Sequence, residues 1–430
     1  MNNTLKVFKG ALLVACSSLA NGQLIAIEDE ELSHYSGQAF ITIDQPESIT
    51  EGASTFKYTR INMGMDIETI MTQDEVKLGA YDDQRDITGT GVDIHMTDVG
   101  FGTYFNPHDY FRVNSSGDIV YGSDGLPVPD PSKFPINPAT GEQFTYDDVG
   151  APMPFHIKDP YVEFAFKEEG GVQSLAGMRI GYGGAKGIMT SNMLSMTGNQ
   201  DVIISDTAAA LGTQDPDGFF GFLLKYVSPL LLGDSTLATR AVLQQVPDDP
   251  NPGQALDYRA THIGVEDGYK FVTKAQDVGV FNWFLLKTSM DLFAPAETGA
   301  ETVCTTTNAL GSCTGGDINL YTSGCELVGM DTCFPLTKYQ SIDVGKGDYA
   351  NGMFLGVQAE DVPWRTDVFV SDNITDPTVP GEYVEGVMRA AKGFYMNIPT
   401  GGVRLDLKEA TTYGLPRQTT RYTDASLGLF

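Results

Sequence analysis

Positive charge is scarce in this chain, which holds 27 lysines and arginines against 56 aspartates and glutamates, a formal net charge of −29. Nucleic acids and anionic lipid surfaces would repel such a chain, so we expect no nucleic-acid partner. The charge does not predict disorder, because 41% of the residues are hydrophobic and 10% are aromatic. That content is enough for a large core.

Long apolar runs are also missing. No stretch approaches the ~20 consecutive apolar residues that a membrane helix needs. The nearest, 219–232, is interrupted by Lys225 and Pro229. The sequence therefore predicts no transmembrane segment. The 48 glycines and 22 prolines favour turns and short strands over long helices.

Catalytic signatures are missing as well. There is no nucleophile elbow and no phosphate-binding loop. The pair of glycines at 181–183 lacks the third glycine of a dinucleotide site, and it predicts a tight strand corner instead. The histidines never show a zinc-helix spacing; they are His34, His95, His108, His156 and His262. We therefore expect no enzyme, and no catalytic, cofactor-binding or metal-binding residue.

Calcium is the one cofactor that the sequence leaves open. Segments 114–118 and 215–218 offer oxygen ligands in turns. Neither matches the twelve-residue calcium loop with its closing glutamate. Solvated turns are the better interpretation, and we expect no bound cofactor.

The N-terminus has the order of a secretory signal. Lys6 and Lys9 precede a short apolar run at 11–15, and small and polar residues follow. Residues 20–22 fit the small-x-small cleavage rule, which predicts Gln23 as the mature N-terminus. Cleavage there removes two basic residues and no acidic ones, so the mature chain carries 25 − 56 = −31 formal charges.

A second form of processing stays open at Cys16. The residues before it resemble a lipoprotein box, and acylation of Cys16 would tether the protein to a membrane. The apolar core before Cys16 is short for that processing, so ordinary cleavage is the favoured interpretation.

Four of the five cysteines lie within 30 residues of one another: Cys304, Cys313, Cys325 and Cys333. In an exported chain an even cluster predicts disulfides. We favour the pairs that close short loops, Cys304–Cys313 and Cys325–Cys333. The spacings do not resemble the paired knuckles of structural zinc sites. Segment 294–335, which is rich in threonine and glycine, is predicted to be a peripheral insert apart from the main sheet. The two bridges would stabilise this insert.

Alternation of apolar and polar residues predicts an all-β fold. It is clearest at 55–65, 92–99, 161–166 and 403–407. From 177 onward, short strands are expected to alternate with Gly and Asn corners. The architecture that fits is an elongated irregular β-solenoid, or stacked twisted sheets, with loop insertions; a large β-sandwich is the alternative.

Few helices are expected, and the best candidates are short, at 27–35 and 205–211. The predicted domain organisation is a signal peptide at 1–22 and a single β-rich unit at 23–430. That unit carries the insert at 294–335 and a loop excursion at 106–160, which is rich in Pro, Gly, Asp and Asn.

One segment resembles a known family. It contains Glu31, Leu32, Ser33, Ser36, Gly37 and Gln38. It is similar to the start of a family of exported proteobacterial surface proteins with the pattern Glu-Leu-Ser-x-x-Thr-Gly-Gln-Ala, followed by β-structure. The family is a domain of unknown function, and some members are described as pilus-system proteins. Ser36 stands where the family has threonine. The resemblance implies a location at the cell surface of a Gram-negative bacterium, outside the cell or in the periplasm. It carries no catalytic residues.

Three functions follow as expectations. The first is a non-enzymatic structural or adhesive surface protein, such as a pilus-associated or filament subunit. It would associate with itself or with other surface proteins through exposed sheet edges. The second is a secreted binding protein for an apolar or polymeric ligand. The third, least favoured, is a hydrolase on a β-solenoid scaffold.

Overall fold

The structure is a computed structural model, and it describes residues 41–80, 91–114, 117–208, 210, 235–244, 251–275, 278–293, 299–327, 330–369, 374, 376–377 and 383–420. These residues belong to one compact unit, Ile41–Phe430. The predicted signal, both forms of N-terminal processing, the helix expected at 27–35 and the family segment at 31–38 lie outside the described residues. So does the calcium candidate at 215–218.

Strands dominate the described chain, which confirms the all-β prediction. The strands are β1 (Ile41–Asp44), β2 (Ile49–Glu51), β3 (Ser54–Met63), β4 (Asp66–Thr69), β5 (Met71–Ala80), β6 (Val92–Phe101), β7 (Thr103–Tyr104), β8 (Pro152–Met153), β9 (Phe155–Glu169), β10 (Val172–Met196), β11 (Gly198–Thr207), β12 (Thr236–Gln244), β13 (His262–Gly264), β14 (Lys270–Ala275), β15 (Ala300–Thr307), β16 (Cys313–Tyr321), β17 (Glu326–Leu327), β18 (Met330–Asp331), β19 (Cys333–Pro335), β20 (Ser341–Val344), β21 (Phe354–Gln358), β22 (Val362–Phe369), β23 (Tyr383–Ala390) and β24 (Gly393–Leu405).

The helical elements are fewer. They are α4 (Val280–Phe293), the short 3-10 helices η1 (Pro107–Asp109), η2 (Pro131–Lys133), η3 (Tyr146–Asp148), η5 (Leu336–Lys338) and η6 (Gly345–Gly347), and the π-helix η7 (Glu409–Tyr413).

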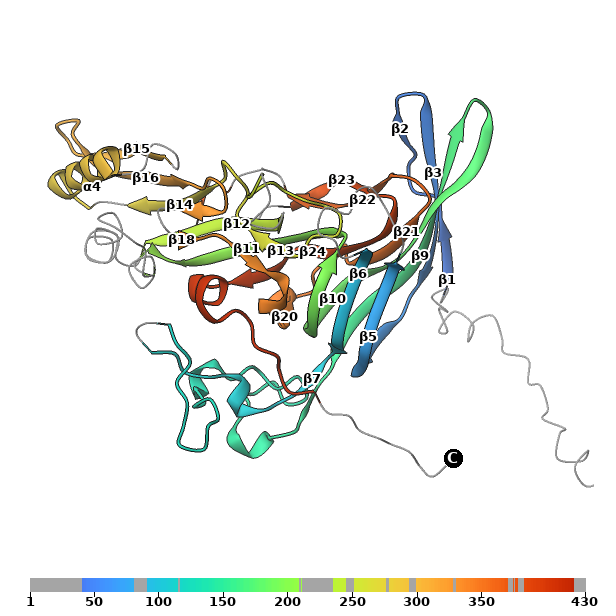
Figure 1. Cartoon of the computed structure of the whole chain (residues 1–430), viewed down its shortest axis with the longest axis horizontal. Helices are drawn as coiled ribbons and strands as arrows, with labels where there is room; N and C mark the ends of the chain where they lie inside the picture. The colour runs from blue at the N-terminus through green and yellow to red at the C-terminus, as the bar shows by residue number, and fades with distance from the viewer. Residues whose placement is uncertain are drawn as a thin grey trace, which may run out of the picture. The chain divides into compact units, whose positions relative to one another are not determined.

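A continuous ladder joins most of the strands (Figure 1). It runs through β1, β3, β9, β10, β21, β24, β11, β12, β14, β16 and β15. Between the named strands of the described chain, β11–β24 is the one parallel pairing. The coils of a β-solenoid stack their strands in parallel, so the antiparallel order matches stacked sheets.

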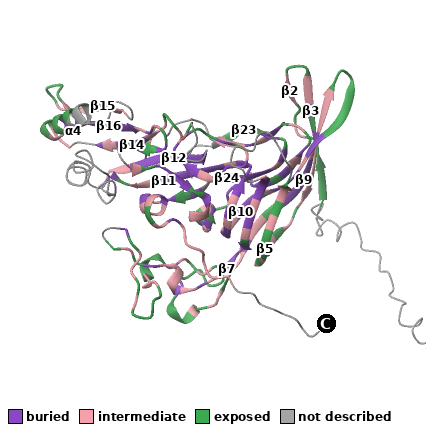
Figure 2. Ribbon diagram, viewed as in Figure 1, coloured by how far each residue is buried: buried purple, intermediate pink, exposed green. Residues whose placement is uncertain are grey.

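Strand β10 links two parts of the sheet. Its first half lies between β9 and β21. Its second half lies between β6 and β20, with β5 beyond β6. Buried residues are concentrated on β10, β11, β12 and β24, which therefore contain much of the core (Figure 2).

The corners expected from 177 onward are wrong, because β10 runs for 25 residues without a break. Gly181 lies opposite Tyr161 of β9 in the ladder. A Cβ at Gly181 would lie 2.3 Å from Tyr161 Cζ. The glycine is therefore needed to admit a large ring across the strands, and it does not turn the chain.

Two helix expectations also need correction. Within 205–211 the chain continues strand β11 as far as Thr207, paired with β12, so the predicted helix is wrong there; Ala208 and Ala210, which follow, are in a 3-10 turn. Helix α4 was not predicted. Trp283 and Leu286, three residues apart, are buried on one side of it, while Phe281 is 71% exposed. That spacing was the available signal.

The excursion expected at 106–160 contains η1, η2 and η3 and a few isolated β-bridges between β7 and β8. Strand β9 already begins at Phe155, before the expected end of the excursion. The segment has a small aromatic core of its own, in which the Phe105 and Phe144 rings stack at 4.4 Å and Phe134 packs edge-on. These rings explain how a segment rich in turns holds its conformation.

The structure joins Cys304 to Cys313 and Cys325 to Cys333, the pairing that the sequence favours. The expectation of a peripheral insert apart from the main sheet is wrong. Strands β15 and β16 extend the sheet through β14, and β19 pairs with β13. At least one glycine of this segment is needed for strand pairing: Gly316 lies so close to β15 that a Cβ would overlap the carbonyl oxygen of Val303.

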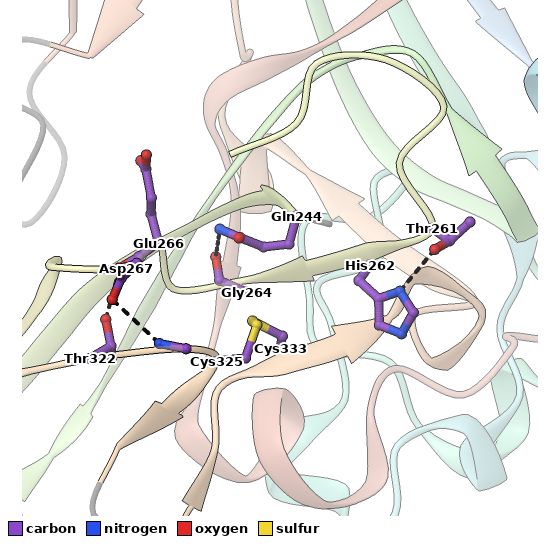
Figure 3. The surroundings of a disulfide bond; sticks show 10 residues. Gln244, Thr261, His262, Gly264, Glu266, Asp267, Thr322, Cys325 and Cys333 are labelled. Atoms are coloured by element: carbon purple, nitrogen blue, oxygen red, sulfur yellow. Dashed lines mark hydrogen bonds between the residues drawn. A yellow bond between two sulfur atoms is a disulfide. The ribbon is translucent and has the colours of Figure 1, made fainter. Parts of the chain in front are cut away.

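The second disulfide lies beside β13 (Figure 3). Gly264 of β13 pairs with Cys333, and a Cβ on Gly264 would lie 2.7 Å from Cys333 Sγ. Gln244 Nε2 donates to the Gly264 carbonyl at 3.2 Å. The bridge is therefore packed into the sheet.

Candidate functional site

The candidate site is a pocket of about 790 Å³. Five parts of the chain line it: the excursion between β7 and β8, residues 153–156 at the end of β8 and the start of β9, β10 near Gly187, the segment 341–347, and the segment 403–418. None of these was singled out as a site from the sequence, because residues that are distant in sequence form it together.

One wall is a tight turn that follows β20. Gly345, Lys346 and Gly347 have positive φ angles of 79°, 45° and 100°. A Cβ on Gly345 would lie 3.3 Å from the backbone nitrogen of Ala350 and 3.4 Å from the carbonyl oxygen of Ala185, so this turn lies tightly against β10. The left-handed conformation of Lys346 is unusual for a residue with a side chain, and such strain often marks functional positions.

A second wall is the segment after β24. Leu415 N donates to the Lys338 carbonyl at 3.1 Å, and Gln340 N donates to the Leu415 carbonyl at 2.7 Å. The Tyr339 hydroxyl donates to the Ala410 carbonyl at 2.7 Å. These bonds fix the segment beside β20.

The same segment is tied to the excursion through Thr419. Asp109 accepts a hydrogen bond from Thr419 N at 2.6 Å, and Asn106 Nδ2 donates to Thr419 Oγ1 at 2.7 Å. Tyr104 N donates to the Thr419 carbonyl at 3.1 Å. Figure 1 shows this red segment leaving β24 and reaching the neighbourhood of β7. Hydrogen bonds through Thr419 therefore connect the segment after β24 to the excursion.

Four cations line the pocket: Lys133, Lys186, Lys346 and Arg404. None of them forms an ion pair with another residue of the described chain. Lys133 instead lies 6.0 Å from the centre of the Phe111 ring, and Lys186 lies 4.6 Å from that of Tyr349. Such contacts leave the ammonium groups able to bind an anion.

Carboxylates also face the pocket. Asp343 is accessible, but the surrounding walls reduce its hydration, which raises the pKa of its carboxyl to about 6; the charge of Lys346 partly offsets this. Burial and the negative charge of the neighbouring Asp406 raise the pKa of Glu409, and the positive charges of Lys346 and Lys133 offset part of this rise. Both carboxyls are thus more readily neutralised than ordinary ones.

The remaining lining is apolar and aromatic. Phe111 and Tyr413 meet edge to face at 5.4 Å. Ile136, Met153 and Leu415 add aliphatic surface. A lining that combines apolar surface with a few polar groups is typical of ligand sites.

The described histidines take different partners. His95 lies 3.0 Å from Glu75, and His156 lies 3.5 Å from Glu68. His108 contacts the Pro127 carbonyl, and His262 contacts Thr261. No group of three or more metal-ligating side chains occurs in the described ranges. At 114–118, Asn114 Nδ2 donates to Asp118 Oδ2 at 3.0 Å, across a turn.

A second polar cluster, around Arg179, is structural. Arg179 donates to Glu163 at 2.5 Å, and both side chains are buried. The guanidinium carbon lies 4.7 Å from the Trp364 ring centre and 4.8 Å from that of Phe354. Because the pair is buried with its aromatic neighbours in the core between β10 and the β22–β23 hairpin, it offers no surface to a ligand.

No known protein family, curated protein or solved structure matches this chain. The similarity of segment 31–38 to exported surface proteins stays a prediction. In the part of the chain that is described, no helix is long and apolar enough to cross a membrane. Function is therefore argued from the site.

Proposed function

We propose that this chain is an exported, non-enzymatic binding protein that takes an apolar ligand, or the apolar part of a larger one, into the pocket of about 790 Å³. The pocket is the observation that carries the proposal. Its volume lies in the range of small-molecule sites, which is roughly 300–1,000 Å³. The missing catalytic signatures in the sequence support binding without turnover.

Export is part of the proposal. The N-terminal signal pattern supports it, and two disulfides are compatible with an oxidising compartment. A location at the cell surface, outside the cell or in the periplasm of a Gram-negative bacterium rests on the resemblance of segment 31–38.

The test uses N-phenyl-1-naphthylamine, an uncharged dye that becomes fluorescent in apolar sites. We expect saturable binding to the chain from Gln23 onward. Ile136 lines the pocket with 59% of its surface exposed, so Ile136→Asp should weaken binding without unfolding the chain. The matched control is Leu310→Asp, at a turn where the side chain is 89% exposed and lies outside the pocket. Absence of saturable binding, or equal losses in both variants, would remove the proposal.

A second candidate, a structural or adhesive surface protein such as a filament subunit, is favoured by an exposed sheet edge. Strand β1 pairs only with β3 in the described chain, and its Ile43 is 68% exposed. A free edge can accept a strand from a second copy or from another surface protein.

An apolar row continues from that edge across the sheet. Cross-strand pairing aligns Ile43, Ile61, Val162, Ile180 and Leu355 on one face. Assembly through β1 would extend this row. Ile43→Lys should lower light scattering by the concentrated protein if assembly uses this edge. Unchanged scattering by an associating protein would exclude the edge.

A further inference from the structure

The pocket has a charge pattern that the rest of the chain does not lead one to expect. With 56 acidic residues against 27 basic ones, a cation has many carboxylates available to it. Elsewhere cations use them: Lys57 pairs with Glu168, and Lys167 with Glu169 and Glu360. The four pocket cations form no ion pair within the described residues, although carboxylates are abundant in the chain.

These cations come from four separate elements. Lys133 ends η2 in the excursion, Lys186 lies on β10, Lys346 occupies the turn after β20, and Arg404 lies on β24. Like charges gathered in one pocket repel one another, and their fields add at its centre. The fold thus brings together charges that the sequence keeps far apart.

The geometry of Lys346 adds to this argument. Its left-handed backbone is costly for a lysine, whereas the glycines on both sides adopt positive φ without strain. A third glycine would make the turn more easily. The lysine therefore contributes something other than turn geometry, and it lines the pocket.

Three carboxylates, Asp109, Asp343 and Glu409, also line the pocket, and when all of them are ionised the four cations still exceed them by one positive charge (4 − 3 = 1). Asp109 is engaged by Thr419 through N–H and hydroxyl bonds. Asp343 and Glu409 have raised pKa values because their surroundings disfavour the ionised form. The buried Ser341, which also lines the pocket, has a hydroxyl with no hydrogen-bond partner in the described chain.

We infer that the pocket recognises an anionic group, a carboxylate, phosphate or sulfonate, through Lys133, Lys186, Lys346 and Arg404, and so selects ligands that join such a group to an apolar body. This inference rests on the proposed ligand-binding function. It narrows the ligand class from apolar compounds in general to amphiphilic anions. Arginine and lysine bind such oxygens by charge-assisted hydrogen bonds.

A matched pair of dyes separates the two claims. The compound 8-anilinonaphthalene-1-sulfonate has the ring system of N-phenyl-1-naphthylamine with one added sulfonate. We expect the sulfonate to bind at least about tenfold more tightly at low salt, with a preference that falls as salt screens the charges. Equal affinities would overturn the anion inference and leave ligand binding intact. No binding of either dye would overturn both.

Variants locate the effect. Lys346→Asn combined with Arg404→Gln should weaken sulfonate binding about tenfold, since each partly exposed charge contributes a factor of roughly three. Asparagine tolerates the left-handed conformation at 346. Binding of the neutral dye should stay within about twofold. Lys77→Met removes one positive charge from β5, outside the pocket, and should leave both affinities unchanged. An equal loss in this control would show that only net charge matters, which would overturn the inference.

Discussion

Single residues decide how closely the layers of this protein approach. Gly181 admits the ring of Tyr161, Gly264 admits a disulfide, and Gly316 admits the backbone of β15. Each position is a glycine because a neighbouring strand or side chain occupies the space of a Cβ. In the sequence alone, such glycines were indistinguishable from turn glycines.

Gly181→Ala should lower the free energy of unfolding by about 1–3 kcal/mol, because its Cβ would overlap the Tyr161 ring. The measurement is urea denaturation. In a Tyr161→Leu background the same substitution should cost much less, since the ring is gone. An equal cost in both backgrounds would contradict this explanation.

The raised pKa of Asp343, about 6, predicts a pH dependence of stability. The folded state holds this proton more tightly than the unfolded chain, whose aspartates titrate near ~3.9. Between these two values the folded protein binds more protons, so stability should fall as pH rises from about 4 to 6. Glu409, whose pKa is also raised, acts in the same direction.

Asparagine does not ionise, so Asp343→Asn should remove the fall in stability that ionisation of Asp343 causes. The variant should therefore be more stable than the parent chain above pH 6, but not near pH 4. Denaturation at both pH values measures this. Asp147→Asn, on an exposed part of η3 outside the pocket, is the matched control. A gain at pH 4 as large as that at pH 7 would contradict the assignment.

At the scale of elements, the two disulfides occupy different surroundings. Cys304 is exposed in the middle of β15, whereas Cys325 and Cys333 are buried beside β13. Reducing agents reach a disulfide only where solvent does. The bridges should therefore respond differently to reduction in the folded protein.

Under native conditions dithiothreitol should reduce Cys304–Cys313 first and leave Cys325–Cys333 intact until the chain unfolds. Alkylation followed by peptide mass spectrometry gives the order. Replacing the buried pair with alanines should cost about 2–4 kcal/mol of stability, the usual range for a native disulfide. Simultaneous reduction of both bridges would contradict this prediction, because it would show that burial does not protect Cys325–Cys333 in the folded protein.

Period-two alternation predicted β3 and β9, in which one face is more buried than the other, and also β6, which is buried on both faces around Asp93. It failed at β10, where glycines facing neighbouring strands resemble corners. It also failed at α4, where exposed apolar residues such as Phe281 obscure the three-residue spacing of the buried Trp283 and Leu286.

The cysteine segment resembles an insert because its partner strand β14 lies far back in the sequence: Ala275 pairs with Gly316, 41 residues later, and Lys270 with Tyr321, 51 residues later. The pocket could not be predicted, because local patterns carry no information on which distant segments meet.

For the whole molecule, the predicted mature charge of −31 should govern association. Like charges repel over ~30 Å at 0.01 M salt and over ~8 Å at 0.15 M. If copies assemble through β1, light scattering should rise with NaCl, and more steeply with CaCl2, which bridges carboxylates. A monomer under all these conditions would remove the assembly candidate and leave the binding function.

The position of the pocket walls in the sequence has a consequence for the order of folding. A chain synthesised from its N-terminus presents β3, β9 and β10 long before residues 403–419. The bonds of this late segment to Lys338 and Gln340, and to Asn106 and Asp109, connect the region of β20 to the excursion. The excursion and β20 must therefore wait for a late segment before the cavity exists. A nascent chain can therefore form much of the sheet but not the pocket, so it cannot capture a ligand before its C-terminal segment arrives.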